Sequence, residues 1–374
     1  MDERQWAERL ASRIHEKELA VAQRNAERIP YTAVDGVFDD RSGAQDICWW
    51  TNGFWAGQLW QLYHAFGEPR YRAVAEGIEE KLDQNLMNHM GMDHDSGFKW
   101  LLSAGANYRL TGSERAKNRA LLAADNLAGR LNLKAGLIRA WNDPGTGENA
   151  GLAIIDCMMN LPLLYWASEV TRDPRYAQIA VCHADSAARA FIRPDGSVRH
   201  IVVFDPDTGA VTGEPGGQGM GPGSSWTRGQ SWALYGFTLS HRHTGRAAYL
   251  SVAERVADRI LARLPDSGLM PVDYDQSPDC TWEDDTAAAI TACGLLELAP
   301  RTDEARAAAC RAAAVKLLRV LAEQRCLWDS AVDPLLSRCS AAYHDSVHDF
   351  PIIYGDYYFT EAVLRLCGKE AFLW

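Results

Sequence analysis

Asp156 is the only carboxylate in an apolar stretch, residues 149–166, with the sequence NAGLAIIDCMMNLPLLYW. A stretch of this composition is expected to lie in the protein core, where an ionised aspartate is costly and desolvation raises its pKa. An aspartic acid that keeps its proton near neutral pH can donate that proton in catalysis. The alternative is a structural role, in which the Asp156 carboxyl braces a buried helix by bonding to Asn160.

The helices expected around Asp156 are of two kinds, and the first kind has one apolar face. In residues 244–264, for example, Tyr249, Val252 and Val256 recur at helical spacing with charged residues between them. Helices with a single apolar stripe are expected to face outward. They are predicted in residues 1–20, 67–82, 111–131, 172–191, 244–264 and 301–321.

The second kind of helix is poor in charge and is therefore expected to be buried. Such helices are predicted to begin near Trp50, Asp95, Asn149, Ser225, Asp284 and Tyr354. The alternation predicts an all-α fold, an (α/α)6 barrel of inner and outer helices, in one domain spanning residues 1–374. An open solenoid of the same pairs would need polar capping repeats, and the apolar C-terminal helix YYFTEAVLRLC does not provide one.

Two irregular stretches interrupt the helical pattern. Residues 192–225 contain IVVFD and then GEPGGQGMGPGSS, which predict a small β-turn excursion followed by a Gly-rich loop. That loop lacks the following GK[ST] of a phosphate-binding loop, and Ser224–Ser225 has no recognisable base. Residues 327–353 carry His344 and His348, but the chain has no H-E-x-x-H motif, so no metal site is predicted.

If inner and outer helices alternate, all inner helices run in one direction and begin at the same face of the barrel. Aromatic and polar residues gather at these predicted starts: Trp49, Trp50, Asn52, His94, Asp95, Arg228, Trp232, Asp284, Asp285, Tyr354 and Asp356, with Trp141 and Asp156 near another. Core packing does not require this collection at one end. Aromatic walls with a few carboxylates suit a sugar, whose apolar faces stack on rings and whose hydroxyls need polar partners.

Composition limits the partners and the compartment. The net charge of −11 and the absence of a Lys/Arg-rich block argue against nucleic-acid binding. No apolar signal-peptide core and no run long enough to span a membrane are present. The nine cysteines are scattered without a C-x-x-C pair, as expected for reduced thiols of a cytoplasmic protein. A monomer or weak homodimer is expected.

An ordered set of motifs carries a resemblance over nearly the whole chain. The segments are WWTNGFWAGQLW, HDSGF, AWND, IIDCMMNLPLLYWA, SSWTRGQSW, TAAAITACGLLEL and YGDYYFTEAVLRL. Together they resemble the unsaturated glucuronyl hydrolases of glycoside hydrolase family 88, a family with an (α/α)6 barrel. The resemblance implies that Asp156 and Asp95 are the two catalytic carboxylates. It implies a substrate site formed by Trp50, His94, Trp141, His200, Gln218, Arg228 and Trp232.

The resemblance also implies a reaction. The substrate would be an oligosaccharide, such as a glycosaminoglycan disaccharide, with a 4,5-unsaturated uronic acid at its non-reducing end. Asp156 would protonate C4 and then activate the water that adds at C5. Asp95 would hold ring hydroxyls, Arg228 and His200 would hold the substrate carboxylate, and the tryptophans would stack on the sugars. No metal or organic cofactor is expected.

Three other activities remain open from the sequence. They are a related unsaturated rhamnogalacturonyl hydrolase acting on pectin fragments, a sugar epimerase on the same barrel, and a sugar-binding protein without activity. The I-I-D-C carboxylate favours the glucuronyl hydrolase over the first. An epimerase would need paired histidine bases, which no predicted inner-helix start supplies. Residues 340–364 contain no Lys or Arg, which favours an unsulfated second sugar.

Overall fold

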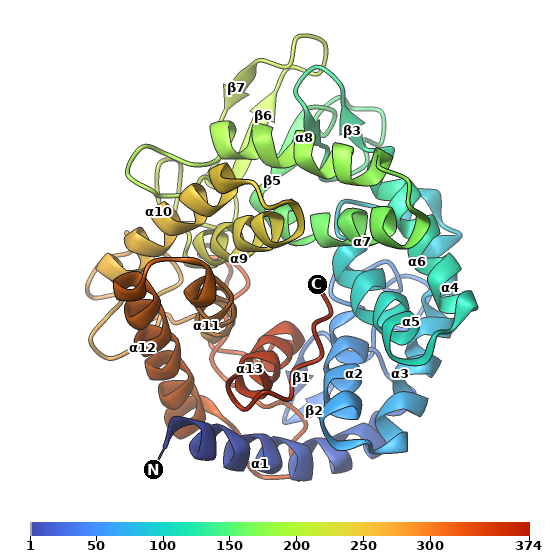
Figure 1. Ribbon diagram of the computed structural model, residues 1–374, viewed down its shortest axis with the longest axis vertical. Helices are drawn as coiled ribbons and strands as arrows, with labels where there is room; N and C mark the ends of the chain where they lie inside the picture. The colour runs from blue at the N-terminus through green and yellow to red at the C-terminus, as the bar shows by residue number, and fades with distance from the viewer. Residues whose placement is uncertain (1) are drawn as a thin grey trace.

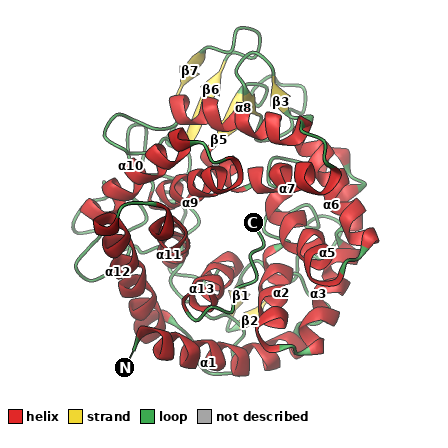
Figure 2. Cartoon of the chain, viewed as in Figure 1, coloured by secondary structure: helices red, strands yellow, loops and turns green. Residues whose placement is uncertain are grey.

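The computed structural model describes residues 2–374, and along them two sets of helices alternate to form a closed ring (Figure 1). The inner set follows a ring around the molecular axis, and the outer set surrounds it (Figure 2). The inner helices are α2 (Phe54–Phe66), η2 with α5 (Gly97–Gly105 and Ala106–Thr111), α7 (Leu161–Thr171), α9 (Thr227–Thr244), α11 (Asp285–Leu298) and α13 (Ile353–Leu366). The outer helices are α1 (Glu3–Arg24), α3 (Pro69–Lys81), α6 (Glu114–Ala128), α8 (Arg175–Ala190), α10 (Ala247–Arg263) and α12 (Glu304–Val320).

The ring closes because its last inner helix packs against its first. Helix α13 contacts both α2 and α11, and α1 contacts α13 and α3. The predicted (α/α)6 barrel is thus confirmed, and an open solenoid is not formed. None of the helices described in residues 2–374 is long and apolar enough to cross a membrane.

Burial follows the apolar patterns that predicted inner and outer positions. Every residue of α11 is buried, whereas α10 buries a single stripe that includes Tyr249, Val256 and Ile260. Burying such a stripe stabilises a helix mainly through the apolar area removed from water, about 25 cal/mol per Å². Side-chain caps are present at the starts of the outer helices α3, α6 and α12; at α6, Ser113 Oγ accepts the backbone N–H of Ala116.

The third inner helix begins later than its composition predicts. Residues 149–160 do not enter a helix: Leu152–Ile154 form strand β5, and Ile155–Met159 form the 3₁₀ turn η3. Strand β5 pairs antiparallel with β6 (Ile201–Phe204), with Ile154 opposite Ile201. Helix α7 then starts at Leu161, with Pro162 in its first turn. The prediction of a helix beginning near Asn149 is therefore wrong, because Leu152–Ile154 pair with β6 as a strand.

The β excursion predicted in residues 192–225 is present beside α8 (Figure 2). It contains β6 and β7 (Val211–Gly213), which pair antiparallel and complete a sheet of order β5-β6-β7. Two hairpins lie elsewhere, β1 (Ala33–Val34) with β2 (Val37–Phe38) and β3 (Leu131–Asn132) with β4 (Leu137–Ile138). Short helical segments complete the description: α4 (Asp83–Leu86), η1 (His89–Gly91), η4 (Ala299–Arg301) and η5 (Leu321–Arg325).

Candidate active site

A cleft of about 350 Å³ opens where the inner helices begin. It brings together segments that precede α2, η2 and α7, the strand pair β5–β6 and the Gly-rich loop. Its lining residues are Trp49, Trp50, His94, Asp95, Trp141, Ile154, Asp156, His200, Ile201, Gly217 and Gln218. Seven residues predicted from the sequence lie on this wall, namely Trp50, His94, Asp95, Trp141, Asp156, His200 and Gln218.

Asp156 lies on η3 between the strand pair and α7, with its side chain 14% exposed. Its Oδ1 lies 3.8 Å from Nε2 of His200 and has no hydrogen-bond partner among residues 2–374. Burial raises the pKa of the Asp156 carboxyl to about 7, and the positive charge of Arg228 opposes part of this rise. A carboxyl group with this pKa is partly protonated near neutral pH and can act as a general acid.

His200 faces Asp156 in one defined tautomer. The backbone N–H of Gln218 donates to Nδ1 of His200 over 2.9 Å, so the ring proton is carried by Nε2, on the Asp156 side. Burial lowers the pKa of His200 to about 3, so the ring is neutral. Gly217 has a φ of +59°, and a Cβ there would lie 2.0 Å from Nδ1 of His200. Only glycine allows the loop to approach the ring this closely.

Asp95 is the second carboxylate of the cleft. Its Oδ2 lies 3.4 Å from Nε2 of His94, and its Oδ1 accepts a hydrogen bond of 3.4 Å from Asn160 Nδ2. Burial raises the pKa of Asp95 well above its usual value, with further contributions from the charges of Asp93 and Asp156, while Lys99 lowers it. His94 remains neutral because burial lowers its pKa to about 4.

Asn160 connects the two carboxylate segments. Its Oδ1 accepts the backbone N–H of Phe98 over 2.9 Å, and its Nδ2 also donates to the main-chain oxygen of Asp156 over 3.3 Å. The alternative of an Asp156 carboxyl that bonds Asn160 is therefore wrong: the contact uses the Asp156 carbonyl and leaves its carboxyl facing the cleft. The Asn160 side chain instead positions Asp95.

A glycine makes this connection possible and supports a prediction. A Cβ on Gly97 would lie 2.6 Å from Cα of Asn160 and 2.9 Å from its Oδ1. We expect Gly97→Ala to displace Asn160, lower kcat by at least about tenfold and destabilise the fold by about 1–3 kcal/mol. Steady-state kinetics and thermal denaturation measure both effects. Gly43→Ala is the control, because a Cβ there meets nothing within 4 Å; equal behaviour of the two variants would contradict the prediction.

Arg228 and Trp232 do not line the cleft, although both are predicted from the sequence to bind substrate. The Arg228 guanidinium is 1% exposed, and Nη1 binds Asp284 Oδ2 at 2.5 Å and the carbonyl of Ser340 at 2.6 Å. Its Nη2 donates to the carbonyl of Ala341. Trp232 is fully buried between Phe98 and Tyr358. Both Nη atoms of Arg228 therefore donate to protein atoms, and the positive charge of the guanidinium acts on the cleft by lowering the pKa of Asp156.

Two further acidic residues predicted at inner-helix starts also have structural partners. Asp356 accepts the backbone N–H groups of Leu335 and Leu336, at 2.9 and 2.8 Å, and Asp285 accepts that of Arg338 at 3.0 Å. They anchor the irregular segment that precedes α13 rather than facing a ligand.

His344 and His348 are not arranged as a metal pair. His348 stacks on the Trp282 ring at 3.9 Å, and Nε2 of His344 lies 2.7 Å from the carbonyl of Met220. Among the described residues no group of three His, Cys, Asp or Glu side chains is placed to hold a metal.

Four cleft residues were not among the predicted site residues. Trp49 stands in the WW doublet, among the aromatic and polar residues at the predicted inner-helix starts. Ile154 and Ile201 face each other across the β5–β6 pair, which joins segments distant in the sequence. Gly217 belongs to the Gly-rich loop. Glycines in a loop indicate that the backbone approaches another group closely, but the sequence does not identify that group.

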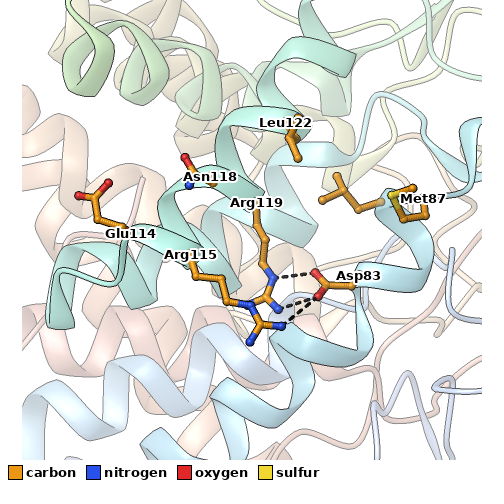
Figure 3. Close-up of a pocket in the computed structure, with 8 residues that line it drawn as sticks. Asp83, Met87, Glu114, Arg115, Asn118, Arg119 and Leu122 are labelled. Carbon is orange, nitrogen blue, oxygen red and sulfur yellow. Dashed lines mark hydrogen bonds and ion pairs between the residues drawn. The ribbon is translucent and has the colours of Figure 1, made fainter.

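Another hollow lies elsewhere, in an open groove of about 540 Å³ beside α4 and α6 (Figure 3). Arg119 there chelates Asp83 through Nε and Nη2, both at 2.6 Å, and Nη1 binds Glu79 (Figure 3 shows the Asp83 contacts). Met87 and Leu122 are exposed along its edge. Asp83 is paired with Arg115 and Arg119, and Glu114 is paired with Lys117 outside the groove. The groove holds none of the predicted site residues.

A closed helical barrel with two carboxylic acids and three tryptophans in one cleft has the features of a carbohydrate-active enzyme. Residues 21–305 match the Glycosyl Hydrolase Family 88. The chain is 40% identical over 327 residues to an unsaturated glucuronyl hydrolase of Bacillus sp. (strain GL1), covering 85% of this chain and 86% of the relative. It is 34% identical over 345 residues to an unsaturated chondroitin disaccharide hydrolase of Streptococcus agalactiae, covering 90% and 86%.

A solved structure agrees with these sequence relatives. It is an unsaturated glucuronyl hydrolase variant from Streptococcus agalactiae complexed with dGlcA-GalNAc6S, with a TM-score of 0.82 and 28% identity. The match covers 97% of this chain and 93% of that one. The chain therefore belongs to Glycosyl Hydrolase Family 88, and it is a glycoside hydrolase.

Proposed function

We propose that the cleft removes a 4,5-unsaturated uronic acid from the non-reducing end of oligosaccharides that polysaccharide lyases release. The observation that carries this proposal is the Asp156 carboxyl, which has a pKa of about 7 and lies in a cleft beside a second carboxylate, Asp95. The relatives named above act, by their names, on unsaturated glucuronyl and chondroitin disaccharide substrates.

The chemistry starts from the enol ether of the unsaturated ring. Its C4 is electron-rich, so transfer of the Asp156 proton to C4 forms a C–H bond there and leaves an oxocarbenium-like centre at C5. The Asp156 carboxylate then takes a proton from water as the water oxygen bonds to C5. The resulting hemiketal opens and releases the second sugar at C1. Because C1 is not attacked directly, the spacing of the carboxylates does not predict a retaining or inverting outcome.

The other cleft residues have proposed binding roles. The neutral His200 presents its Nε2–H beside Asp156 and is suited to hold the substrate carboxylate, whereas both Nη atoms of Arg228 already donate to protein atoms. Asp95 is placed to bind ring hydroxyls, with Asn160 positioning it. Trp50 and Trp141 offer ring faces to the sugars. Gln218 donates through Nε2 to the carbonyl of Ala341, which leaves its Oε1 as the free acceptor.

An epimerase remains less well supported, even though the fold brings two histidines into one cleft. His94 and His200 have pKa values lowered to about 4 and about 3, which makes both rings weak bases at neutral pH. The Nδ1 of His200 already accepts the Gln218 N–H. The relatives reported above are named as hydrolases.

The proposed reaction is tested with an unsaturated disaccharide from a polysaccharide lyase. Hydrolysis should remove the ultraviolet absorbance of the conjugated C4=C5 bond, and reaction in D₂O should place deuterium at C4. The saturated disaccharide with the same linkage should be left intact. Cleavage of both substrates, or release of the second sugar with the double bond retained, would rule out hydration at C5.

The activity should fall as pH rises above neutrality. Asp156 must be protonated to donate to C4, and with a pKa of about 7 its protonated fraction decreases above pH 7. We expect kcat to drop by about tenfold per pH unit on the alkaline side, as for loss of one essential proton. The measurement is the pH dependence of kcat between acidic and mildly alkaline buffers, and a kcat that rises through this range would contradict the assignment.

We also propose that the whole chain forms one catalytic domain that works in the cytoplasm as a monomer or weak homodimer. The nine cysteines of the chain are all unpaired, which suits a reducing compartment.

A further inference from the structure

A second pocket of about 390 Å³ adjoins the catalytic cleft. Trp141 lines both, so one indole forms the wall between them. This side chain is 43% exposed, and it stacks on no other aromatic ring in the described chain. The remaining lining of this side pocket comes from His89, Met90, Asp125, Asn126, Gly129, Arg130, Arg139, Asn142 and Asp143.

The carboxylates of the side pocket are already satisfied by the protein. Asp125 Oδ1 accepts from Tyr176 at 2.7 Å and from Arg175 at 3.0 Å. Asp143 accepts the backbone N–H groups of Gly145, Gly147 and Asn149, at 2.7–3.0 Å. Hydrogen bonds to its charged form lower the pKa of Asp143, so it stays ionised with its acceptor capacity largely used.

The two guanidinium groups of the pocket have no carboxylate partner. Arg130 is 8% exposed and donates to the carbonyls of Met92, Arg139 and Ala140, at 2.9–3.0 Å, and to Asn142 Oδ1 at 2.9 Å. No hydrogen bond or ion pair joins the Arg139 side chain to any residue described between 2 and 374. With Asp125 paired to Arg175, the pocket keeps two guanidinium groups against one ionised carboxylate, Asp143, whose oxygens already accept backbone N–H groups.

The hydrogen bonds of Arg130 also fix the position of this pocket relative to the catalytic cleft. Arg130 donates to the carbonyl of Met92, which lies two residues before His94. Arg130 also donates to the carbonyl of Ala140, and this carbonyl accepts the backbone N–H of His94 at 3.0 Å. Asn142 donates to the same Met92 carbonyl at 2.8 Å. The segments that carry His94 and Trp141 are thus bound to one buried guanidinium.

We infer that the side pocket binds an anionic group on a sugar beyond the scissile linkage, with Arg139 as its charged partner and Trp141 as the stacking surface between the two sites. This inference rests on the proposed function. A sugar carboxylate and a sugar sulfate share the required chemistry, because a guanidinium forms paired hydrogen bonds with either oxyanion. An oligosaccharide bound in both pockets would pass over the Trp141 ring. An uncharged sugar would stack on the indole, and the anionic group of the next sugar would bind Arg139.

The test compares two unsaturated substrates from one non-sulfated uronate polymer. The disaccharide carries no anion beyond the scissile linkage, whereas the tetrasaccharide carries an internal uronate. We expect Arg139→Gln to lower kcat/KM for the tetrasaccharide by about tenfold, equivalent to about 1.4 kcal/mol, and to leave the disaccharide value within twofold. Arg139→Lys should restore part of the loss, and the loss should shrink at high salt because exposed charges are screened.

Lys134→Gln is the matched control, since it removes the same charge from the β3–β4 hairpin that directly precedes Arg139, at an exposed position outside the pocket. A sulfated unsaturated disaccharide separates the two anion sources: a loss on it in Arg139→Gln shows that the pocket takes a sugar sulfate, and a loss on the non-sulfated tetrasaccharide shows that it takes a uronate carboxylate. If Arg139→Gln and Lys134→Gln have equal effects, or the Arg139 variant loses both substrates alike, the inference is overturned. An enzyme inactive on both substrates would instead contradict the proposed function itself.

Discussion

Replacing Asp156 with Asn is expected to lower kcat by about 10²–10⁴-fold, the usual contribution of a general acid–base group. The amide has nearly the same shape but cannot deliver a proton to C4 or accept one from water. KM should change little, because the Asp156 carboxyl bonds no ring hydroxyl in the proposed arrangement. The measurement is single-turnover and steady-state loss of the C4=C5 absorbance.

The same substitution should have a measurable effect on stability, with a defined sign. The folded-state pKa of Asp156 is raised to about 7 from its ordinary 3.8, so the folded protein binds this proton more tightly than the unfolded chain. The contribution to stability is fully present below the unfolded pKa and is lost as pH rises through about 7. Above that pH, Asp156→Asn should therefore melt at a higher temperature than the wild type.

Asp279→Asn is the matched control for charge, because Asp279 is exposed on a loop. It should change neither kcat nor the melting temperature appreciably. If Asp156→Asn consumed the alkene as fast as the wild type, the general acid would have to be another group, with Asp95 the next candidate in the cleft.

Replacing Arg228 with Ala is expected to destabilise the fold by about 3–5 kcal/mol, as is typical when one partner of a buried ion pair is removed. Asp284 is fully buried and would lose the guanidinium 2.5 Å away. The carbonyl of Ser340 would also lose its Arg228 donor, and that of Ala341 would keep only Gln218 Nε2, which loosens the irregular segment before α13. Thermal or denaturant unfolding measures the loss.

Two comparisons make this prediction specific. Arg72→Ala removes an exposed i,i+4 partner of Glu76 and should cost less than about 1 kcal/mol. The double variant Arg228→Met with Asp284→Leu should recover part of the stability, because it leaves no unpaired buried charge. An Arg228→Ala protein of undiminished stability, altered only in KM, would mean that Arg228 binds the substrate directly, as the sequence suggested.

The amino-acid sequence alone determined the barrel and its two carboxylates. Apolar stripes recur at helical spacing in the outer helices, and the inner segments lack charge, so local periodicity was enough to predict which helices lie inside. Asp156 was identified because a carboxylate within an apolar run is costly unless it has a role. Asp95 required the family motif, since its flanking residues are not unusual.

Only the tertiary structure decided how these residues are used. The β5–β6 pairing moved Asp156 from an expected helix onto a short 3₁₀ turn, and Gln218 set the His200 tautomer. Arg228 was assigned to protein carbonyls more than a hundred residues away in the chain, such as Ser340. Side-chain spacing indicates which face of a helix a residue occupies. The hydrogen-bond partners of a buried side chain depend on groups that come together only after folding, because most buried donors bond to an acceptor.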